Sequence, residues 1–338
     1  MISYRDSLTK IGIPRTTPVS YRSFTSRPHS LRQAIASMDA PASGTWSQVS
    51  EIFRDDTWTD EVQGIGWDGA NWIFSTNANP EKPNVNNKAL YVFKGGQPLG
   101  DGLWLSMLKY KDVPHPVAGH EGDDHWGQLT VFQGSVFVAH FWSGGSFQPD
   151  AAGTGSANVV RFTNTNGVLT FSRWIELDQP TALDGRRARA EFQCVNPWDG
   201  MFYTCFGDGV ISELFIHDPN TGKWTGRSLK LNPPVTGVQG ACFSPHGHLY
   251  ISTNSLLPSD ERFQTIWYYS PLNGHQFGVI PVLAEEGLPF QELEGICFGG
   301  VETAGGAAQI HAILLENPKI ALDNIFFKSF GSSNPTVV

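Results

Sequence analysis

The sequence is short of charge, cysteine and methionine, and it contains no long apolar run. Charged residues make up 16% of the 338 positions, and only 4 cysteines and 4 methionines are present. No stretch stays apolar over the ~20 residues that a membrane-spanning helix requires, and no Cys/His spacing matches a zinc site. Only Ser30–Met38 has the pattern of a short helix. The sequence therefore excludes a membrane-spanning helix, a helical bundle and a zinc-stabilised domain.

Negative charge is in excess, but it is unevenly distributed. The net charge is −9, whereas residues 1–40 contain six basic and two acidic side chains, so the remainder carries about −13. This surplus argues against nucleic acid or an anionic membrane as a partner of the body. It suits a neutral or cationic ligand, or bound divalent cations.

The basic, serine-rich start of the chain resembles an organellar transit segment in composition. The alternative is a tail that packs across the body of the protein. No apolar core region of a secretory signal follows the first basic residue. We therefore expect a cytoplasmic protein, or an organellar one if residues 1–40 are a transit segment.

A strand–turn–strand unit recurs five times along the chain. Equivalent positions lie 47 to 66 residues apart, close to the roughly 40–60 residues of one four-stranded propeller blade. The pattern predicts an all-β, five-bladed β-propeller with four-stranded antiparallel blades, with a two-sheet sandwich as the alternative. The copies are 62–76, 125–139, 191–204, 238–252, and 293–298 continued by 310–315.

The two ends of the repeat region complement each other. The fifth copy lacks a fourth strand, whereas Trp46–Phe53 has a strand pattern and no partner. We predict that Trp46–Phe53 is the outermost strand of the last blade, because this closes the ring and leaves no sheet edge open. The predicted organisation is a single propeller over 46–338, preceded by an extension over 1–45 that packs on it or is partly flexible.

The cysteines are predicted to be buried and reduced. Cys242 and Cys297 occupy the same position on two inner strands, and Cys194 lies one position earlier on a third. Different blades hold these positions apart, so small buried side chains are favoured over disulfides. A pairing of Cys194 with Cys205 across neighbouring strands is the alternative.

Polar side chains gather where the first strand of each repeat begins. In a propeller these strands line the central channel, so their starts converge in space. Acids from four of the five blades would repel one another unless a cation, a shared proton or a ligand separated them. The sequence therefore predicts one functional site at the channel mouth, the alternative being that these groups cap backbone atoms between blades. The residues are Asp60, Glu61, Gln63, Asp124, His125, Trp126, Glu191, Gln193, Gln239, Glu292 and Glu294.

The ends of the second strands supply further candidates. The tripeptide 75–77 is repeated at 252–254, and its Thr and Asn side chains suit either a polyhydroxylated ligand or turn hydrogen bonds. The chain has 11 tryptophans, whose flat faces suit sugar rings or apolar ligands, although Trp72 and Trp198 are expected to pack between blades. The ligand-binding candidates here are Asn77, His140, Trp142 and Asn254.

The segment from Glu191 through 198–204 resembles the unit that carries the general-acid Glu in five-bladed arabinanase/xylosidase-type inverting glycosidases. The resemblance implies three acids from the starts of different inner strands, here Asp60 or Glu61, Asp124 and Glu191. The Asp-Pro that opens the first strand in that family is replaced by 63–64, which read Gln-Gly.

Three acids in these positions would suit acid/base hydrolysis. Phe192 beside Glu191, and Trp198 expected near it, favour the protonated form of a general acid. Asp124 suits the ionised partner and Glu61 or Asp60 the base, at roughly 6.5–9.5 Å from the acid in an inverting reaction. Calcium takes roughly six to eight oxygen ligands, so a calcium ion on the axis is a further prediction. Its ligands would be Glu61, Asp124, Glu292 and Glu294.

The leading interpretation is an enzyme with one site at the channel mouth, acting like a hydrolase on a neutral or sugar-like substrate. A carbohydrate-binding lectin-type propeller is one alternative. A cyclase or lyase that acts on an apolar metabolite in an aromatic-lined pocket is another, and a protein-binding scaffold is a third. The first-strand positions differ between the five repeats, which favours one asymmetric site over five equivalent lectin sites. The sequence leaves the substrate and the oligomeric state open.

Overall fold

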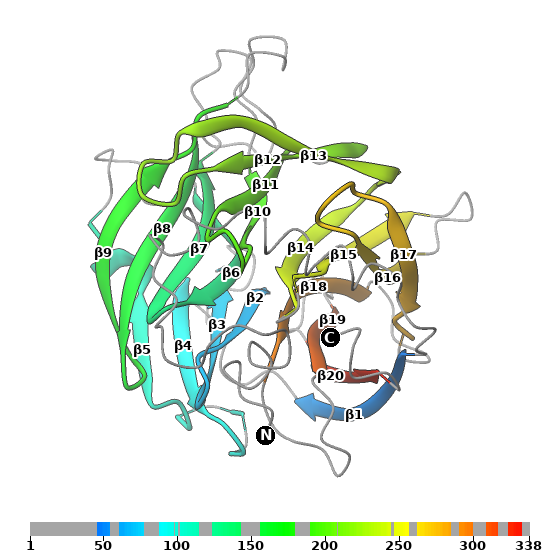
Figure 1. Cartoon of the computed structure of the whole chain (residues 1–338). Helices are drawn as coiled ribbons and strands as arrows, with labels where there is room; N and C mark the ends of the chain where they lie inside the picture. Colours follow the sequence, from blue (N-terminus) through cyan, green and yellow to red (C-terminus); the bar gives the residue numbers. More distant parts are fainter. Residues whose placement is uncertain are drawn as a thin grey trace, which may run out of the picture.

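The computed structural model gives the chain as five four-stranded antiparallel sheets arranged around a common axis (Figure 1). The predicted five-bladed propeller is confirmed. The described residues are 46–54, 61–77, 88–97, 99–100, 102–114, 124–142, 156–179, 190–207, 209–244, 247–256, 262–284, 291–299, 309–316 and 324–332. Within them, no helix is long and apolar enough to cross a membrane.

Each blade runs from an inner strand at the axis to an outer strand at the rim. Blade one is β2 (Val62–Trp67), β3 (Asn71–Thr76), β4 (Ala89–Lys94) and β5 (Ser106–Lys109), followed by the short 3₁₀ helix η1 (Tyr110–Asp112). Blade two is β6 (Asp124–Phe132), β7 (Ser135–Trp142), β8 (Ser156–Thr165) and β9 (Val168–Glu176). Blade three is β10 (Ala190–Val195), β11 (Phe202–Phe206), β12 (Ile211–His217) and β13 (Trp224–Val235).

Blade four is β14 (Val238–Phe243), β15 (Leu249–Leu256), β16 (Arg262–Tyr269) and β17 (Gln276–Pro281). Blade five is β18 (Gln291–Phe298), β19 (Gln309–Glu316), β20 (Asn324–Ser332) and, outermost, β1 (Trp46–Arg54). β1 pairs antiparallel with β20, from Trp46 opposite Ser332 to Arg54 opposite Ile325. This pairing puts Trp46–Phe53 in the outermost position of blade five. The predicted extension over 1–45 lies outside the described residues.

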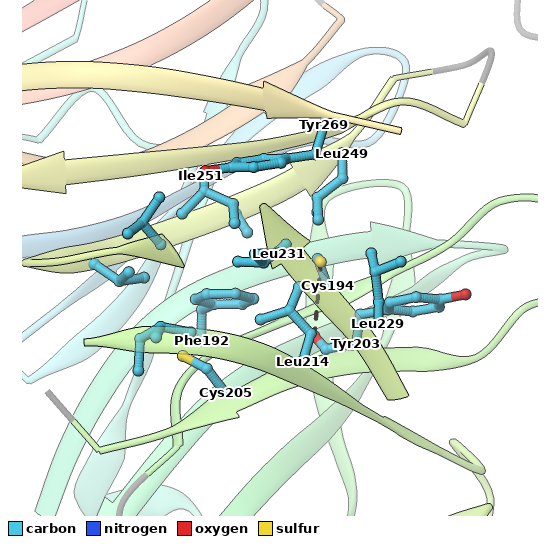
Figure 2. Packing of buried hydrophobic residues seen from close by; sticks show 14 of the residues in the cluster. Phe192, Cys194, Tyr203, Cys205, Leu214, Leu229, Leu231, Leu249, Ile251 and Tyr269 are labelled. Atoms are coloured by element: carbon cyan, nitrogen blue, oxygen red, sulfur yellow. Dashed lines mark hydrogen bonds between the residues drawn. The ribbon is translucent and has the colours of Figure 1, made fainter. Parts of the chain in front are cut away.

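The hydrophobic core is divided into layers between neighbouring blades. In the layer between blades three and four, Phe192 and Leu231 pack toward Ile251 and Tyr269 (Figure 2). Phe192 and Ile251 are fully buried, and burial of a large apolar side chain contributes about 1.5–3 kcal/mol. These layers fix the directions of the inner strands and hence of the side chains at the axis.

All four cysteines are reduced and buried, as predicted, so Cys194 and Cys205 form no disulfide. Burial raises the pKa of each thiol. One detail of the prediction is wrong: Cys194 lies level with Cys242, since each pairs with the second residue of the next strand (Tyr203 and Tyr250). The strand bounds agree, since Cys194 and Cys242 are each the fifth residue of their inner strands, β10 and β14.

Trp72 and Trp198 pack between blades, as predicted. The Trp72 ring lies edge-on to Phe327 of blade five, with centroids 4.9 Å apart. Trp198 is buried and contacts Gly247 of blade four so closely that a Cβ there would lie 2.3 Å from the indole.

His311 is enclosed between blades five and one. Its ring lies edge-on to Trp72 with centroids 4.7 Å apart, and its Nδ1 is 2.8 Å from the Ser329 Oγ. Burial lowers the pKa of His311 from 6.5 to about 3, partly offset by a hydrogen bond with the Gly299 backbone. The neutral ring is therefore part of the folded structure.

We expect the protein to lose stability as the pH falls from 6.5 toward 3, because the unfolded state then binds a proton on His311 that the folded state does not. This contribution approaches about 1.4 kcal/mol per pH unit. In His311→Gln the slope of the unfolding free energy against pH should decrease by that amount. Urea unfolding of both proteins at several pH values checks this, and equal slopes would assign the pH dependence to other groups.

Candidate functional site

An irregularity in strand pairing interrupts all five inner strands at the same level. In each blade the inner strand has one residue more than its partner strand over this interval. Such bulges redirect a side chain and are common beside active sites. The intervals are Val62/Gly64, Trp126/Leu129, Ala190/Gln193, Val238/Gly240 and Leu293/Ile296.

One polar side chain lies within each irregularity. Two are carboxyl groups and three are carboxamides. Gln128 follows its glycine, Gly127, whereas Gln63, Gln239 and Glu294 precede theirs, so the five side chains do not all lie at one level of the axis. We call this set the bulge ring. Its members are Gln63, Gln128, Glu191, Gln239 and Glu294.

Gln128 was not predicted from the sequence, and it is fully buried. Its Nε2 donates to the Ile296 carbonyl of blade five (2.6 Å) and lies 3.4 Å from the Ile65 carbonyl of blade one. A Cβ on Gly295 would lie only 2.2 Å from the Gln128 Oε1 and 2.6 Å from the Gly64 Cα. Gln128 and the glycine backbone therefore fill the axis, which is why these positions accept no side chain.

Gln193 also has a structural contact. It is fully buried, and its Nε2 donates to the Phe137 carbonyl of blade two at 2.6 Å. This bond links blade three to blade two. Gln193 is therefore part of the packing between these two blades and does not belong to the bulge ring.

The serine of the repeated tripeptide joins blades one and four to the blade that follows each of them. The Ser75 Oγ donates to the Gly127 carbonyl at 2.7 Å, and the Ser252 Oγ donates to the Glu294 carbonyl at 2.8 Å. Both bonds run from a second strand to the inner strand of the following blade.

The asparagine of the same tripeptide also bonds to the inner strand of the following blade. The Asn77 Nδ2 donates to the Trp126 carbonyl and its Oδ1 accepts from the Trp126 amide, both at 2.9 Å. The Asn254 Oδ1 accepts from the Leu293 amide at 2.7 Å. These contacts favour the hydrogen-bonding interpretation over ligand binding for Asn77, whose side chain is buried.

Trp126 and His140 lie in an aromatic cluster between blades one and two, and both are fully buried. The Trp126 ring is edge-on to Tyr110 (5.2 Å between centroids), and His140 stacks on the same Tyr110 at 6.2 Å. Trp174 completes the cluster, with centroids 4.7 Å from His140. Both side chains are therefore enclosed by other aromatic rings of the protein.

Glu191 is half-buried, near the start of β10. Trp198 lies in the turn beyond the far end of that strand. The residues from Glu191 to Val195 alone span about 13 Å at ~3.3 Å per residue, so the expectation that Trp198 lies near Glu191 is wrong. Phe192, beside Glu191, is fully buried.

Glu61 has an unusual backbone. Its φ is +50°, in the left-handed region. Gln133 and Asn166 share this feature, but both lie in hairpin turns, each followed by glycine. Glu61 instead immediately precedes β2. Strained residues of this kind cluster at functional sites.

The remaining candidates are placed as follows. His125 and Glu292 are half-buried at the starts of β6 and β18. The backbones of Asp124 and Trp142 belong to β6 and β7, but their side chains lie outside the described structure, as does all of Asp60. Among the described residues, no group of three His, Cys, Asp or Glu side chains could hold a metal ion.

Comparison with known proteins identifies relatives in structure but not in sequence. No family model and no curated protein matches the sequence. The exo-β-1,3-galactanase of Clostridium thermocellum matches with a TM-score of 0.52 at 12% identity, over 81% of this chain and 61% of that one. A family 43 β-1,3-galactosidase solved with galactodeoxynojirimycin matches with a TM-score of 0.54 at 12% identity, over 82% of this chain and 94% of that one. At such identities the likeness shows a shared propeller fold, and this chain spans less than two thirds of the galactanase.

Proposed function

We propose that this protein is a glycosidase-like hydrolase with a single active site on the accessible side of the bulge ring. The observation that carries the proposal is that one polar residue from each blade, Glu in two blades and Gln in three, lies within the same irregularity of the inner strands. Five identical residues would suit repeated binding sites, whereas unequal residues suit one substrate held in one orientation. The fold shared with the galactanase and the galactosidase is consistent with this proposal.

In this proposal Glu191 is the general acid that protonates the leaving group. It is half-buried on the bulged segment of β10, beside the buried Phe192, an apolar neighbour that favours the protonated carboxyl form. Asp124 at the start of β6 is the ionised partner. Glu61 or Asp60 activates water, since both immediately precede the inner strand of blade one.

The backbone of Glu61 supports this assignment. A left-handed conformation costs a non-glycine residue roughly 1–2 kcal/mol, and a carboxylate that must be aimed at the channel mouth is one reason to retain it. A Glu61→Gln variant isolates the carboxylate, because it leaves this backbone conformation in place.

The direct test is hydrolysis of a panel of neutral glycosides. Aryl glycosides of galactose, xylose and arabinose, and the corresponding oligosaccharides, are incubated with the wild-type protein, and released sugar is measured. The proposal expects turnover of at least one substrate class, with inversion at the anomeric carbon followed by NMR. Absence of turnover over the whole panel would refute it.

A calcium ion on the axis is a further part of this proposal. Glu61, Asp124, Glu292 and Glu294 would supply carboxylate oxygens, the ligands that calcium prefers. Glu61, Glu292 and Glu294, the three whose side chains the structure describes, alone form no group that could hold a metal ion, so this site requires Asp124. We expect EDTA to lower the melting temperature, because removal of a cation leaves like charges close together, and we expect added calcium to restore it. An unchanged melting temperature and unchanged activity in EDTA would refute the calcium site.

A lectin-type propeller is the second candidate, and one observation favours it. Blades one and four share the sequence Val-Gln-Gly in the inner strand, at 62–64 and 238–240. Repeated polar residues in a propeller suit repeated sugar contacts. A protein that binds a sugar of the panel without hydrolysing it would be assigned to this class.

A further inference from the structure

Blades one and four are near copies of each other at their inner ends. Their first strands contain Val-Gln-Gly at 62–64 and 238–240, and Ser-Thr-Asn lies at or near the end of their second strands, at 75–77 and 252–254. The strand pairing is also the same, since a single glutamine is the extra residue in both irregularities. Equivalent residues in the two blades can therefore be compared one by one.

Every residue of the two motifs except the glutamine has a structural role. Val62 and Val238 are buried in the core. A Cβ on Gly64 would lie 2.8 Å from the Leu129 amide nitrogen, and one on Gly240 would lie 3.3 Å from the Gly295 Cα. The valines fill the core, and the glycines allow neighbouring inner strands to approach.

The threonines bond within their own blades. The Thr76 Oγ1 is 3.3 Å from the Ala89 carbonyl, and the Thr253 Oγ1 is 2.8 Å from the Thr265 Oγ1. The serines and asparagines bond to the following blade, as described above. Only the glutamine side chains of the duplicated motifs remain to be explained.

Gln63 and Gln239 are half-buried, and neither carboxamide makes a hydrogen bond within the described part of the chain. They differ in this from Gln128 and Gln193, which are fully buried and bonded to backbone carbonyls. Gln63 and Gln239 therefore retain hydrogen-bonding groups for a molecule outside the protein.

Their position in the ring relates them to a carboxyl group. The inner strand of blade five, β18, contacts both β14 of blade four and β2 of blade one. Gln239, Glu294 and Gln63 are therefore consecutive around the ring, with Glu294 between the two carboxamides. Glu191 lies on blade three, on the other side of Gln239.

We infer that Gln63 and Gln239 form a two-sided clamp for the hydroxyl groups of a neutral sugar ring, bound over Glu294. A carboxamide offers two donors and one acceptor, so each can bridge two adjacent hydroxyl groups, which both donate and accept. Glu294, between the two glutamines in the ring, is buried, and in its ionised form it disfavours an anionic sugar at this place by charge repulsion. This inference rests on the proposed function in taking the ligand to be a sugar, and it assigns the residues that select it.

The test measures binding separately from hydrolysis. Methyl glycosides of galactose, xylose and arabinose are titrated calorimetrically into wild type, Gln63→Ala and Gln239→Ala. We expect each substitution to raise the Kd of the best ligand about tenfold, the effect of about 1.4 kcal/mol of lost hydrogen bonding, with an unchanged melting temperature. Gln276→Ala is the matched control, because Gln276 is also half-buried and makes no side-chain hydrogen bond, but lies on the outer strand β17.

Ligands that lack one hydroxyl group show which hydroxyl group each glutamine binds. Removal of the hydroxyl that Gln63 binds should weaken binding to wild type but not to Gln63→Ala, because the contact is already absent there. Methyl galacturonide should bind at least tenfold more weakly than methyl galactoside. Equal binding of the two would overturn the selection of neutral sugars.

The outcomes separate the two proposals. If wild type hydrolyses a glycoside but either glutamine variant binds as tightly as wild type, the clamp is refuted and the proposed function stands. If wild type binds a sugar through both glutamines without hydrolysing it, the clamp stands and the hydrolase is refuted. If no sugar of the panel binds to wild type, both are refuted.

Discussion

Glu191→Gln is expected to lower kcat by about 10²–10⁴-fold, the usual contribution of one proton-transferring group, while the Kd for the sugar stays close to that of wild type. Glutamine preserves the shape of the side chain at the irregularity of β10 but cannot donate a carboxylic proton. The loss should be largest for substrates whose leaving group needs protonation. It should be small for dinitrophenyl glycosides, whose leaving group departs as an anion.

Comparison of the two leaving groups is therefore the decisive measurement for this variant. Glu213→Gln is the matched control, since Glu213 lies in the same blade on β12, away from the axis, and should retain wild-type kcat. Full turnover by Glu191→Gln, or equal losses with both leaving groups, would show that Glu191 does not act as the general acid.

Deletion of residues 1–54 is expected to prevent folding to a soluble monomer. This deletion removes β1, so β20 becomes an open edge of blade five (Figure 1). An exposed edge strand of this length is a template for aggregation. The buried Phe326, Phe327 and Phe330 of β20 would also lose the strand beside them. Solubility, gel filtration and thermal unfolding report the result.

Deletion of residues 1–45 is the control, because it retains every described strand. That protein should remain monomeric and should unfold within a few degrees of the full chain. If the two truncated proteins have the same melting temperature and are both monomeric, closure by β1 contributes little to the stability of the ring.

The blade architecture could be predicted from the sequence because it depends on local patterns. Alternating apolar residues, glycine turns and the even repeat identify strands without knowledge of their partners. The unpaired segment Trp46–Phe53 could be placed for the same reason, since a ring of five blades leaves one position for it.

The site was only partly predictable, because its geometry depends on strand pairing. Each inner strand has an extra residue, and the sequence does not show where. Gln128 was therefore overlooked, although it is adjacent to Gly127. A similar limit applies to Trp126, whose polar neighbourhood in sequence suggested a channel residue. The packing of Tyr110 against its ring arises from a segment that sequence periodicity does not connect to it.

The Ser-Thr-Asn repeat shows the same limit for hydrogen bonds. Its residue types suit both ligands and backbone groups, and only the three-dimensional structure shows that Asn77 bonds to the backbone of Trp126. By contrast, the repeat alone was enough to predict Gln63 and Gln239 as candidates. The structure adds that their strands, β2 and β14, both contact β18, the strand that contains Glu294.

A crystal structure of Glu191→Gln soaked with the best-bound glycoside tests the central claim most directly. We predict one sugar per chain, on the accessible side of the bulge ring. Its hydroxyl groups should lie within hydrogen-bonding distance of Gln63 and Gln239, with the glycosidic oxygen next to residue 191. A sugar bound between the blades at the rim, or equivalent sugars in several blades, would contradict a single asymmetric site at the channel mouth.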